Sequence, residues 1–457
     1  MSVVKDITKV SIANIIGLIS AIITGFIVPA YLNIEQYAYL KTFALILSFA
    51  GIFHLGYIDG IYIKYGGKYS HEIDMRLFKT EKYFFILFQI VIAIATLIIG
   101  IFVKEIIIIA IALSILPFNL LSYYQFYYQA IGHFNIYSKI KLIVPFVIML
   151  MNVILVYIVN ISNYLYYISA EIFAYTVAVL YLEFKYSFRI KKLNLIHNIK
   201  PILNHFKVGI YIMLGNLSMI LFFTLGRWVV KVFMTDADFA YYSFATSMMQ
   251  ILTIVISSIA MTFYPYLSRI HQKSNLKRLK IQLIIIGAIF SSSYFIFNLA
   301  VTEFIPKYVL SLKIIGILFA SFPAYAVINA LYINMYKVQK DGKKYISVII
   351  INLIAACLLT LAAFLVKRST ILIAIATTIS FYFWFYYSSK DFKGLKPTLK
   401  EFIFILLYLV MYFVSVLFLN PLWALLLFGS FITLLSFLYK EETGELISKL
   451  FSLIRTK

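Results

Sequence analysis

Long apolar runs separated by short polar connectors are the dominant pattern of this chain. Runs of roughly 20 residues, the length that crosses about 30 Å of hydrocarbon as a helix, recur about fourteen times, and six of them precede a basic connector. The predicted spans are residues 7–32, 37–63, 83–103, 106–131, 142–159, 164–184, 206–234, 239–267, 281–305, 309–336, 345–366, 371–388, 402–419 and 422–439. The pattern therefore predicts an all-α, polytopic membrane protein with about fourteen transmembrane helices.

The order of the spans predicts two six-helix bundles followed by two further helices. We expect an N-terminal lobe at residues 1–190, a basic cytoplasmic connector at 191–205, a C-terminal lobe at 206–389, the two additional helices at 390–440 and an amphipathic cytoplasmic tail at 441–457.

Two short echoes favour a repeat between the lobes. The sequence QYAY at residues 36–39 recurs as DFAY at residues 238–241, and Pro117 has a counterpart in Pro323 six spans later. An even number of spans gives both halves the same orientation, so the repeat would be parallel, with the substrate site between the lobes.

Composition and charge support a membrane setting and exclude other classes. Of 457 residues, 63% are hydrophobic and 13% charged, whereas soluble domains are roughly half apolar and a quarter charged. With both termini placed in the cytoplasm, 32 of the 40 lysines and arginines fall in cytoplasmic segments, as the positive-inside rule requires. Topology therefore explains the net charge of +22 without a nucleic-acid partner. The lone Cys357 excludes a disulfide framework and a cysteine-based metal site within one chain.

Four basic residues lie some turns inside predicted spans, where an ionisable group is costly unless it faces protein or water. They are Lys41, Arg227, Lys231 and Lys313. Arg227 and Lys231 are four residues apart and share a helix face. With Lys41 of the other lobe, they would form a cationic patch that suits a diphosphate. The alternative is that these side chains extend to the membrane surface, and Lys231 has Asp236 close by as a partner.

Acidic and imidazole groups inside the spans are candidates for coupling or gating. Asp59 lies near the end of the second span, where it would bind a coupling ion, latch the lobes together or stabilise a helix end. Glu171 in the sixth span and His54 in the second would take part in proton or sodium coupling, or simply be hydrogen-bonded within the bundle.

Aromatic residues and prolines complete the set of candidates. Tyr124 and Tyr128 belong to the run YYQFYYQ at residues 123–129, which offers rings for sugar stacking but also fits the usual enrichment of tyrosine at membrane interfaces. Pro117 and Pro323 are candidate hinges, because proline removes a backbone hydrogen bond that neighbours must replace.

Three segments carry a resemblance to a known family. Residues 54–67 read HLGYIDGIYIKYGG, residues 260–269 read AMTFYPYLSR and residues 304–313 read FIPKYVLSLK. The first segment resembles the end of the second helix in bacterial polysaccharide flippases of the O-antigen (Wzx) type. These flippases belong to the superfamily that also contains the multidrug and lipid II exporters, and the fourteen-span pattern agrees with that resemblance.

The resemblance implies a flippase rather than an enzyme. Such proteins carry an undecaprenyl-diphosphate-linked oligosaccharide from the cytoplasmic to the outer leaflet by alternating access, for O-antigen or capsule synthesis. It further implies residence in the bacterial inner membrane, polysaccharide polymerase machinery as partners, no cofactor, and coupling to a proton or sodium gradient. Two alternatives stay open: a multidrug exporter of the same superfamily, and a polytopic polymerase or glycosyltransferase that uses a lipid-linked donor. The chain contains no Walker-type glycine loop.

Overall fold

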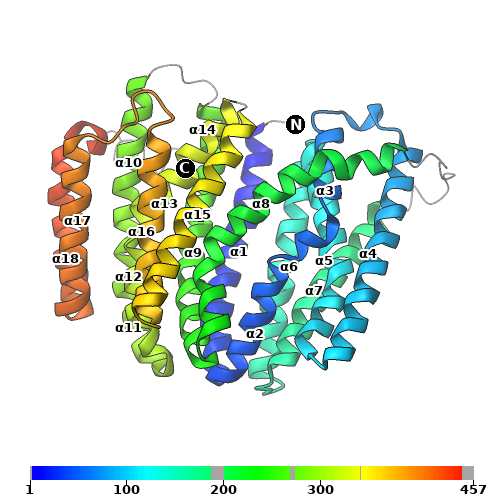
Figure 1. Cartoon of the computed structure of the whole chain (residues 1–457), viewed down its shortest axis with the longest axis horizontal. Helices are drawn as coiled ribbons and strands as arrows, with labels where there is room; N and C mark the ends of the chain where they lie inside the picture. The colour runs from blue at the N-terminus through cyan, green and yellow to red at the C-terminus, as the bar shows by residue number, and fades with distance from the viewer. Residues whose placement is uncertain (1–2, 187–199, 268–272, 340, 445–457) are drawn as a thin grey trace. The chain divides into compact units, whose positions relative to one another are not determined.

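The chain folds into helices throughout the part that the structure describes, residues 3–186, 200–267, 273–339 and 341–444 of a computed structural model (Figure 1). Within those residues no β-strand is formed. Thirteen of the described helices are long and apolar enough to cross a membrane, or up to fourteen if one bent pair is a single span. The predicted all-α, polytopic class and the predicted number of spans are therefore confirmed.

The chain divides into two compact units, residues 1–224 and 225–457. The division falls inside one long helix, α8 (Lys200–Phe233), and not in the predicted connector at 191–205. Most of that connector, residues 187–199, lies outside the described residues, as does the tail from residue 445 onward. The amphipathic character of that tail therefore stays a prediction.

Unit 1 contains α8 as far as residue 224 and the elements that precede it. These elements are α1 (Val3–Tyr31), α2 (Ile34–Leu47), the 3-10 helix η1 (Ala50–His54), α3 (Tyr57–Tyr65), the 3-10 helix η2 (Ser70–Glu72), α4 (Met75–Val103), α5 (Ile106–Ala130), α6 (Phe134–Tyr157) and α7 (Tyr164–Tyr186). Side-chain caps define two of the helix starts: Asn33 accepts from the amide of Gln36, and Asp74 accepts from the amide of Arg76.

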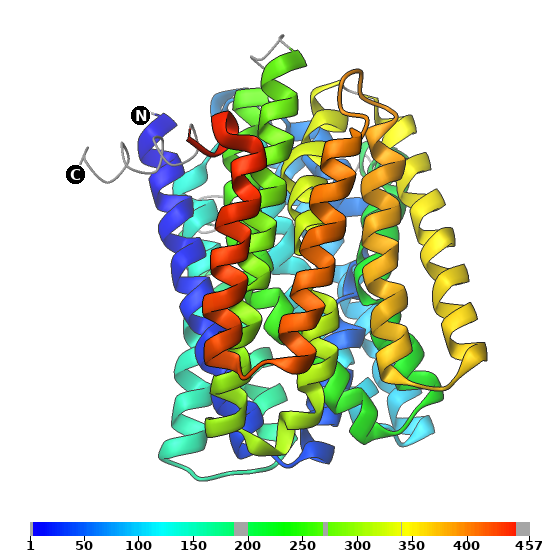
Figure 2. The same cartoon turned by 90° about the vertical axis from the view of Figure 1, so that its left-hand side faces the viewer.

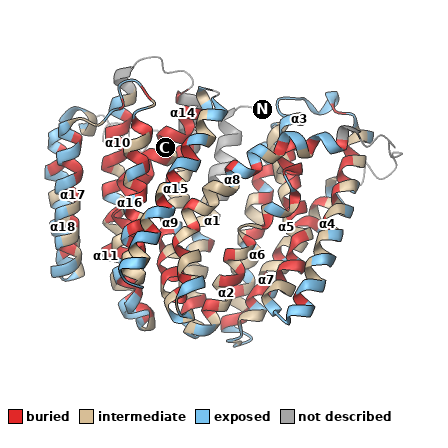
Figure 3. Cartoon of the chain, viewed as in Figure 1, coloured by how far each residue is buried: buried red, intermediate tan, exposed pale blue. Residues whose placement is uncertain are grey.

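Unit 1 packs its helices around α5. This helix contacts α3, α4, α6 and α7, while α1 packs along α6. The core against α5 is rich in rings, with Tyr57, Phe78, Phe85 and Tyr123 all almost fully buried. Opposite faces carry exposed apolar side chains such as Leu87 and Val91 of α4, which is the pattern of helices that face lipid (Figure 3).

Unit 2 contains the end of α8 and the elements that follow. These elements are α9 (Asp236–Leu267), α10 (Lys273–Ser291), α11 (Ser293–Phe304), the 3-10 helix η4 (Pro306–Ser311), α12 (Leu312–Phe319), α13 (Phe322–Val327), the π-helix η5 (Ile328–Tyr332), α14 (Ile333–Val338), α15 (Gly342–Val366), α16 (Thr370–Ser389), α17 (Leu399–Phe418), α18 (Pro421–Ser436) and the 3-10 helix η6 (Phe437–Tyr439). The last two long helices pack together, and α18 also contacts α10 and α11 (Figure 2).

The second span, predicted over residues 37–63, is not one continuous helix. Instead α2 is followed by η1 and then by α3. Leu55 and Gly56, between η1 and α3, both have left-handed backbone conformations, with φ of 47° and 82°. An α-helix cannot continue through such residues, so the chain turns there. We call the segment from Ala50 to Gly56 the elbow.

The predicted tenth span, residues 309–336, is also broken. The helix pair Pro306–Phe319 and Phe322–Val338 is bent by 52° at residues 320–321. Pro323 lies in the first turn of α13, directly after the bend, where its missing N–H is least disruptive. The turn of π-helix that follows is a further irregularity in the same span.

Several further helices begin earlier than the predicted spans, and two of these shifts bring charged residues of the site into a helix. The third span begins at Met75 rather than at residue 83, so Glu81 and Lys82 belong to α4 and not to a connector. The ninth span begins at Lys273 rather than at residue 281, which brings Lys280 into α10. In both cases charged residues hid the first turns of the helix from a hydropathy pattern.

Candidate functional site

Side chains from two neighbouring helices satisfy the backbone groups that the elbow releases. The amide of Gln89 in α4 donates to the carbonyl of Phe53 at 3.1 Å, and the amide of Asn119 in α5 donates to the carbonyl of Ala50 at 3.3 Å. Asn119 also donates to Gln89 at 2.7 Å. Both amide side chains are fully buried. Because unsatisfied carbonyls are costly in a bilayer, these two amides stabilise the break in the helix.

His54 bonds directly to the turn of the elbow. The N–H of Gly56 donates to Nδ1 of His54 at 3.1 Å. Since a backbone N–H is only a donor, Nδ1 must be the unprotonated nitrogen in this arrangement, and the ring proton resides on Nε2. The same Nδ1 lies 4.0 Å from Oδ2 of Asp59, in the first turn of α3.

Asp59 is buried, and two favourable influences act on its carboxylate. Its side chain is 4% exposed. Its Oδ1 accepts from Nδ2 of Asn216 in α8 at 3.2 Å, and its position in the first turn of α3 is favourable for an anion. The expected helix-end role is thus compatible with the geometry, although Asp59 stands at the start of a short helix and not at the end of a long span.

Glycines allow α3 to approach α8 at backbone distance. A Cβ added at Gly209 would lie 1.8 Å from the carbonyl oxygen of Gly56, and one added at Gly60 would lie 2.3 Å from the carbonyl oxygen of His205. No larger residue fits at Gly60 or Gly209 without a shift of the backbone. The Gly56-x-x-x-Gly60 spacing is the small-residue pattern of closely packed membrane helices.

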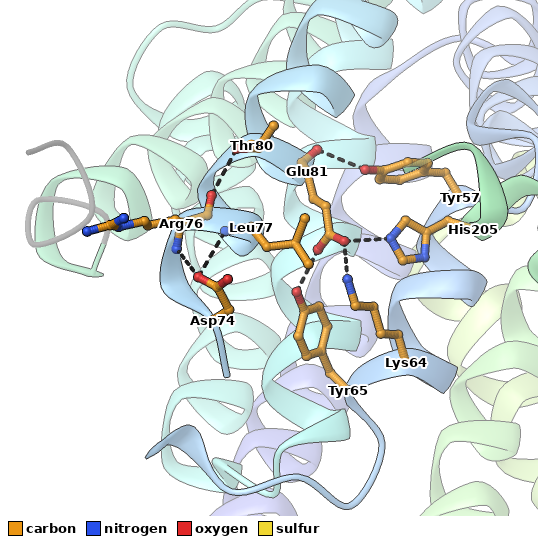
Figure 4. A network of polar contacts seen from close by, with 9 residues as sticks. All are labelled: Tyr57, Lys64, Tyr65, Asp74, Arg76, Leu77, Thr80, Glu81 and His205. Atoms are coloured by element: carbon orange, nitrogen blue, oxygen red, sulfur yellow. Dashed lines mark hydrogen bonds and ion pairs between the residues drawn. The ribbon is translucent and has the colours of Figure 1, made fainter. Parts of the chain in front are cut away.

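A buried charge network lies beside the elbow, which we call the Glu81 cluster: Tyr57, Lys64, Tyr65, Glu81 and His205 (Figure 4). Oε1 of Glu81 accepts from Lys64 and lies 2.8 Å from Nε2 of His205, and Oε2 accepts from the hydroxyl of Tyr65 at 2.6 Å. The hydroxyl of Tyr57 donates to the backbone carbonyl of Glu81 at 2.9 Å. The carboxylate is fully buried and satisfied on both oxygens, so it joins α3, α4 and α8 through one centre.

Sequence reasoning missed the Glu81 cluster. The run KTEK at residues 79–82 has the composition of a solvated connector, and His205 was assigned to the basic connector. The sequence nevertheless contained a signal: Glu81 stands between basic residues directly before an apolar run, a position from which it can enter the helix and form a buried ion pair. Lys82 follows the same rule: it is 2% exposed on its side chain and bonds Glu183 of α7 at 2.9 Å.

The two candidate sugar-binding tyrosines lie in the core of unit 1. Tyr124 is 2% exposed and Tyr128 8%, and the hydroxyl of Tyr124 donates to Glu183. Their rings stack on each other with centroids 6.2 Å apart. Neither ring presents an open face to a sugar in this structure, so sugar contact stays a prediction that their burial does not support.

Glu171 and Lys41 interact with each other inside unit 1. The hydroxyl of Tyr175 donates to Glu171 at 3.1 Å, and Lys41 lies near enough to act on this carboxylate electrostatically. The ammonium of Lys41 also lies over the ring of Tyr37, 5.2 Å from its centroid. Lys41 therefore faces an acid and a ring of its own unit, which differs from a side chain extended to the membrane surface.

Arg227 is the most deeply buried of the four predicted cations. Its exposure is 7%, and its guanidinium lies 6.0 Å from the ring centroid of Phe239 in α9. The neighbouring Gly226 allows the hydroxyl of Tyr242 to lie against α8, since a Cβ there would be 2.2 Å from that oxygen. Tyr242 is also within hydrogen-bond distance of Thr377 in α16, at 3.1 Å. A cation in such surroundings is held inside the protein.

The other two predicted cations of unit 2 lie closer to the surface. Lys231 pairs with Asp236 at 2.6 Å and lies over Phe239, so the local pairing considered as its alternative role is present. Lys313 in α12 is exposed.

Pro117 lies within α5, which continues through it, whereas Pro323 lies at the bend of the tenth span. Hinge roles for both prolines stay predictions.

One ion pair of unit 2 was also missed. Lys280 of α10 bonds Glu401 of α17 at 2.6 Å and the carbonyl of Leu395 at 2.8 Å, with both charged side chains almost fully buried. This pair anchors the first of the two C-terminal helices.

Among the described side chains, no group of three or more histidines, cysteines and acids is arranged to hold a metal ion.

Comparisons with solved structures place this architecture among known folds. The chain is similar to the lipid II flippase MurJ in an inward closed conformation, with a TM-score of 0.65, 18% identity and coverage of 96% of this chain and 99% of that one. Weaker similarities are to an outward-facing multidrug resistance MATE family transporter (TM-score 0.47, 13% identity, 86% and 96% covered) and to a MOP superfamily transporter from Pyrococcus furiosus (0.46, 12%, 86% and 97%). No known protein-family model and no curated protein sequence matches the chain.

The chain is therefore a multi-pass helical membrane protein with the fold of the lipid II flippase MurJ along nearly its whole length. The fold that the resemblance implied is therefore confirmed. The named neighbours are a flippase and transporters, not enzymes.

Proposed function

We propose that this protein is a flippase for lipid-linked oligosaccharides, most specifically for undecaprenyl-diphosphate-linked repeat units of a cell-surface polysaccharide. The observation that carries the proposal is Arg227: a permanently charged guanidinium, 7% exposed, inside a membrane-spanning helix of a fold shared with a lipid II flippase. A buried intramembrane cation is costly, so its presence indicates a function. A lipid-linked diphosphate offers the anionic oxygens that match its planar fork.

The other proposed diphosphate ligands have weaker support. Lys41 retains a place in the proposal because it is held within unit 1, while Lys231 and Lys313 would contribute secondary attraction. Transport would proceed by alternating access and be coupled to a proton or sodium gradient. We propose the bacterial inner membrane as the location, with both termini in the cytoplasm, and polysaccharide polymerase machinery as partners.

The test is a deletion strain complemented with variants of Arg227, in which lipid-linked intermediates and surface polysaccharide are measured by mass spectrometry. We expect Arg227→Ala to reduce export about a hundredfold, as expected when one partner of a buried charge pair is lost, and to strand complete repeat units on the cytoplasmic side. Arg227→Lys should keep part of the export, because it keeps the charge but not the fork. Arg368→Ala is the matched control, since Arg368 is an exposed arginine of the same unit.

The outcomes separate the alternatives. Normal surface polysaccharide in the Arg227→Ala strain, at normal protein abundance, would remove Arg227 from the site. Single repeat units already outside the cell would indicate a polymerase, and truncated units a glycosyltransferase. Intact polysaccharide in the deletion strain together with sensitivity to cationic drugs would indicate a multidrug exporter.

A further inference from the structure

The bond between His54 and Gly56 makes the elbow dependent on the protonation state of one side chain. A neutral imidazole accepts the N–H of Gly56 at Nδ1, at 3.1 Å. A proton added to Nδ1 turns this acceptor into a donor, so two N–H groups would face each other. His54 therefore cannot carry a proton on Nδ1 and accept the N–H of Gly56 at the same time.

An alternative partner for a protonated His54 is already in place. Oδ2 of Asp59 lies 4.0 Å from the same Nδ1, and a movement of about 1 Å would bring the two atoms to hydrogen-bond distance. Asp59 retains Asn216 as a donor to its other oxygen during that movement. The charge of the imidazolium would be compensated by the carboxylate, which makes a buried proton acceptable.

Among the described residues, Asp59 is the acid shown within ion-pair distance of His54. Titratable side chains on the elements around the elbow include Tyr57 and Lys64 of α3, Glu81 and Lys82 of α4, Tyr123 of α5 and His205 of α8. Glu81 is occupied by Lys64, Tyr65 and His205, and Lys82 by Glu183. The polar groups that α4 and α5 bring to the elbow itself are the amides of Gln89 and Asn119, which do not titrate.

We propose that His54 and Asp59 form a proton-binding site whose occupation releases the N–H of Gly56 and loosens the elbow. The proton moves from water to Nδ1 of His54, the Gly56 bond breaks, and a bond from Nδ1 to Oδ2 of Asp59 forms. Gly56 packs against the backbone of Gly209 with no room for a side chain, so its turn and the seating of α3 on α8 are linked. Only the use of this site in transport, as the entry point for a coupling proton, rests on the proposed function.

The test measures the elbow directly in the purified full-length protein. Hydrogen–deuterium exchange of peptides covering residues 50–60 is followed from pH 8 to pH 4 in lipid nanodiscs and expressed as protection factors, so that the intrinsic pH dependence of exchange is removed. We expect protection in the wild type to fall about fivefold on acidification, the factor that corresponds to the loss of one hydrogen bond.

The variant His54→Asn keeps a hydrogen-bond acceptor for Gly56 but removes the group that binds a proton. The Oδ1 of asparagine takes the place of Nδ1 as an acceptor for Gly56 but does not bind a proton near neutral pH. We expect this variant to keep the protected elbow at every pH. Asp59→Asn removes the counter-charge, so the transition should move to more acidic pH. His71→Asn is the matched control, because His71 is exposed, and it should behave as the wild type.

Two results would overturn the proposal. One is an equal loss of protection on acidification in the wild type and in His54→Asn. The other is protection that follows sodium concentration at constant pH in both proteins, which would assign the site to a metal cation. Neither result depends on whether the chain moves a lipid, whereas failure of the Arg227 experiment would leave the elbow measurement intact.

Discussion

Each unit contains one broken span, and different side-chain groups satisfy the backbone polar groups that each break releases. At the elbow in unit 1, the released groups are satisfied by the amides of Gln89 and Asn119 and by the imidazole of His54. At the bend in unit 2, the five successive carbonyls of residues 316–320 accept from hydroxyl groups. The acceptor and donor pairs are Gly316 with Tyr412, Ile317 with Thr378, Leu318 with Ser321, Phe319 with Ser291, and Ala320 with Tyr382 and Tyr408.

The difference determines which break responds to pH. Hydroxyl donors keep their protons throughout the physiological range, so the bend in unit 2 has one hydrogen-bonding state. The elbow in unit 1 includes a group that changes from acceptor to donor when it is protonated. Both breaks pack against a glycine of a neighbouring helix, Gly209 for the elbow and Gly287 for the bend. The steric design is thus shared, and of the side chains named at the two breaks the imidazole of His54 is the one whose ordinary pKa lies near neutral pH.

The largest effect is expected from removing the acid beside the elbow. Glu81→Ala should lower the free energy of unfolding by about 3–5 kcal/mol, because Lys64 and His205 then lose their buried counter-charge. Steric trapping in bicelles would measure this change. Glu81→Gln should cost less, since its amide oxygen still accepts hydrogen bonds. Equal stability of Glu81→Ala and the wild type would show that unit 1 does not depend on the cluster.

A pair of glycine substitutions tests whether the shared steric design is real. Gly209→Ala and Gly287→Ala should each destabilise the protein by about 2–3 kcal/mol, a magnitude typical of overpacking. The effect should be larger at Gly209, where the added Cβ would be 1.8 Å from a backbone oxygen, than at Gly287, where it would be 2.5 Å away. Gly342→Ala is the control, because nothing lies within 4 Å of the added Cβ. A reversed order would contradict the backbone packing described for the elbow.

The smallest effect is expected at the bend, where it should also be independent of pH. Tyr412→Phe removes the donor to the carbonyl of Gly316 and should cost about 1 kcal/mol. Hydrogen exchange of residues 316–327 should give the same protection factors at pH 8 and pH 4, in this variant and in the wild type. A pH response at the bend as large as that of the elbow would remove the contrast between the two units.

Hydrophobic runs predict most of this fold because the bilayer requires them. The bounds of α5, α16 and α18 follow the runs within a few residues, since each helix must match the thickness of the hydrocarbon. The elbow escaped prediction because Leu55 and Gly56 hardly alter mean hydropathy while they redirect the backbone, whereas Pro323, a candidate hinge from the sequence, lies directly after the bend of the tenth span.

The candidate site was less predictable because its partners are distant in sequence. His54 and Asp59 were identified from their position in a span, but Glu81 was missed because its partner His205 lies 124 residues away. Charge pattern alone placed both residues in solvent. Buried amides offered an unused signal: Gln89 and Asn119 stand in apolar runs where only a broken backbone needs them.

The close packing of α3 on α8 has a consequence for how the protein is made. Gly56 of the elbow contacts Gly209 of α8. Because the two glycines are far apart in the sequence, the elbow leaves the ribosome long before the part of α8 against which it packs. At typical elongation rates this delay is on the order of ten seconds. Throughout that interval the nascent chain holds Asp59 and Lys64 at the membrane without the helix that completes their surroundings. Insertion factors or early proteolysis would therefore act on this segment first, and synthesis speed between the two glycines should influence the yield of mature protein.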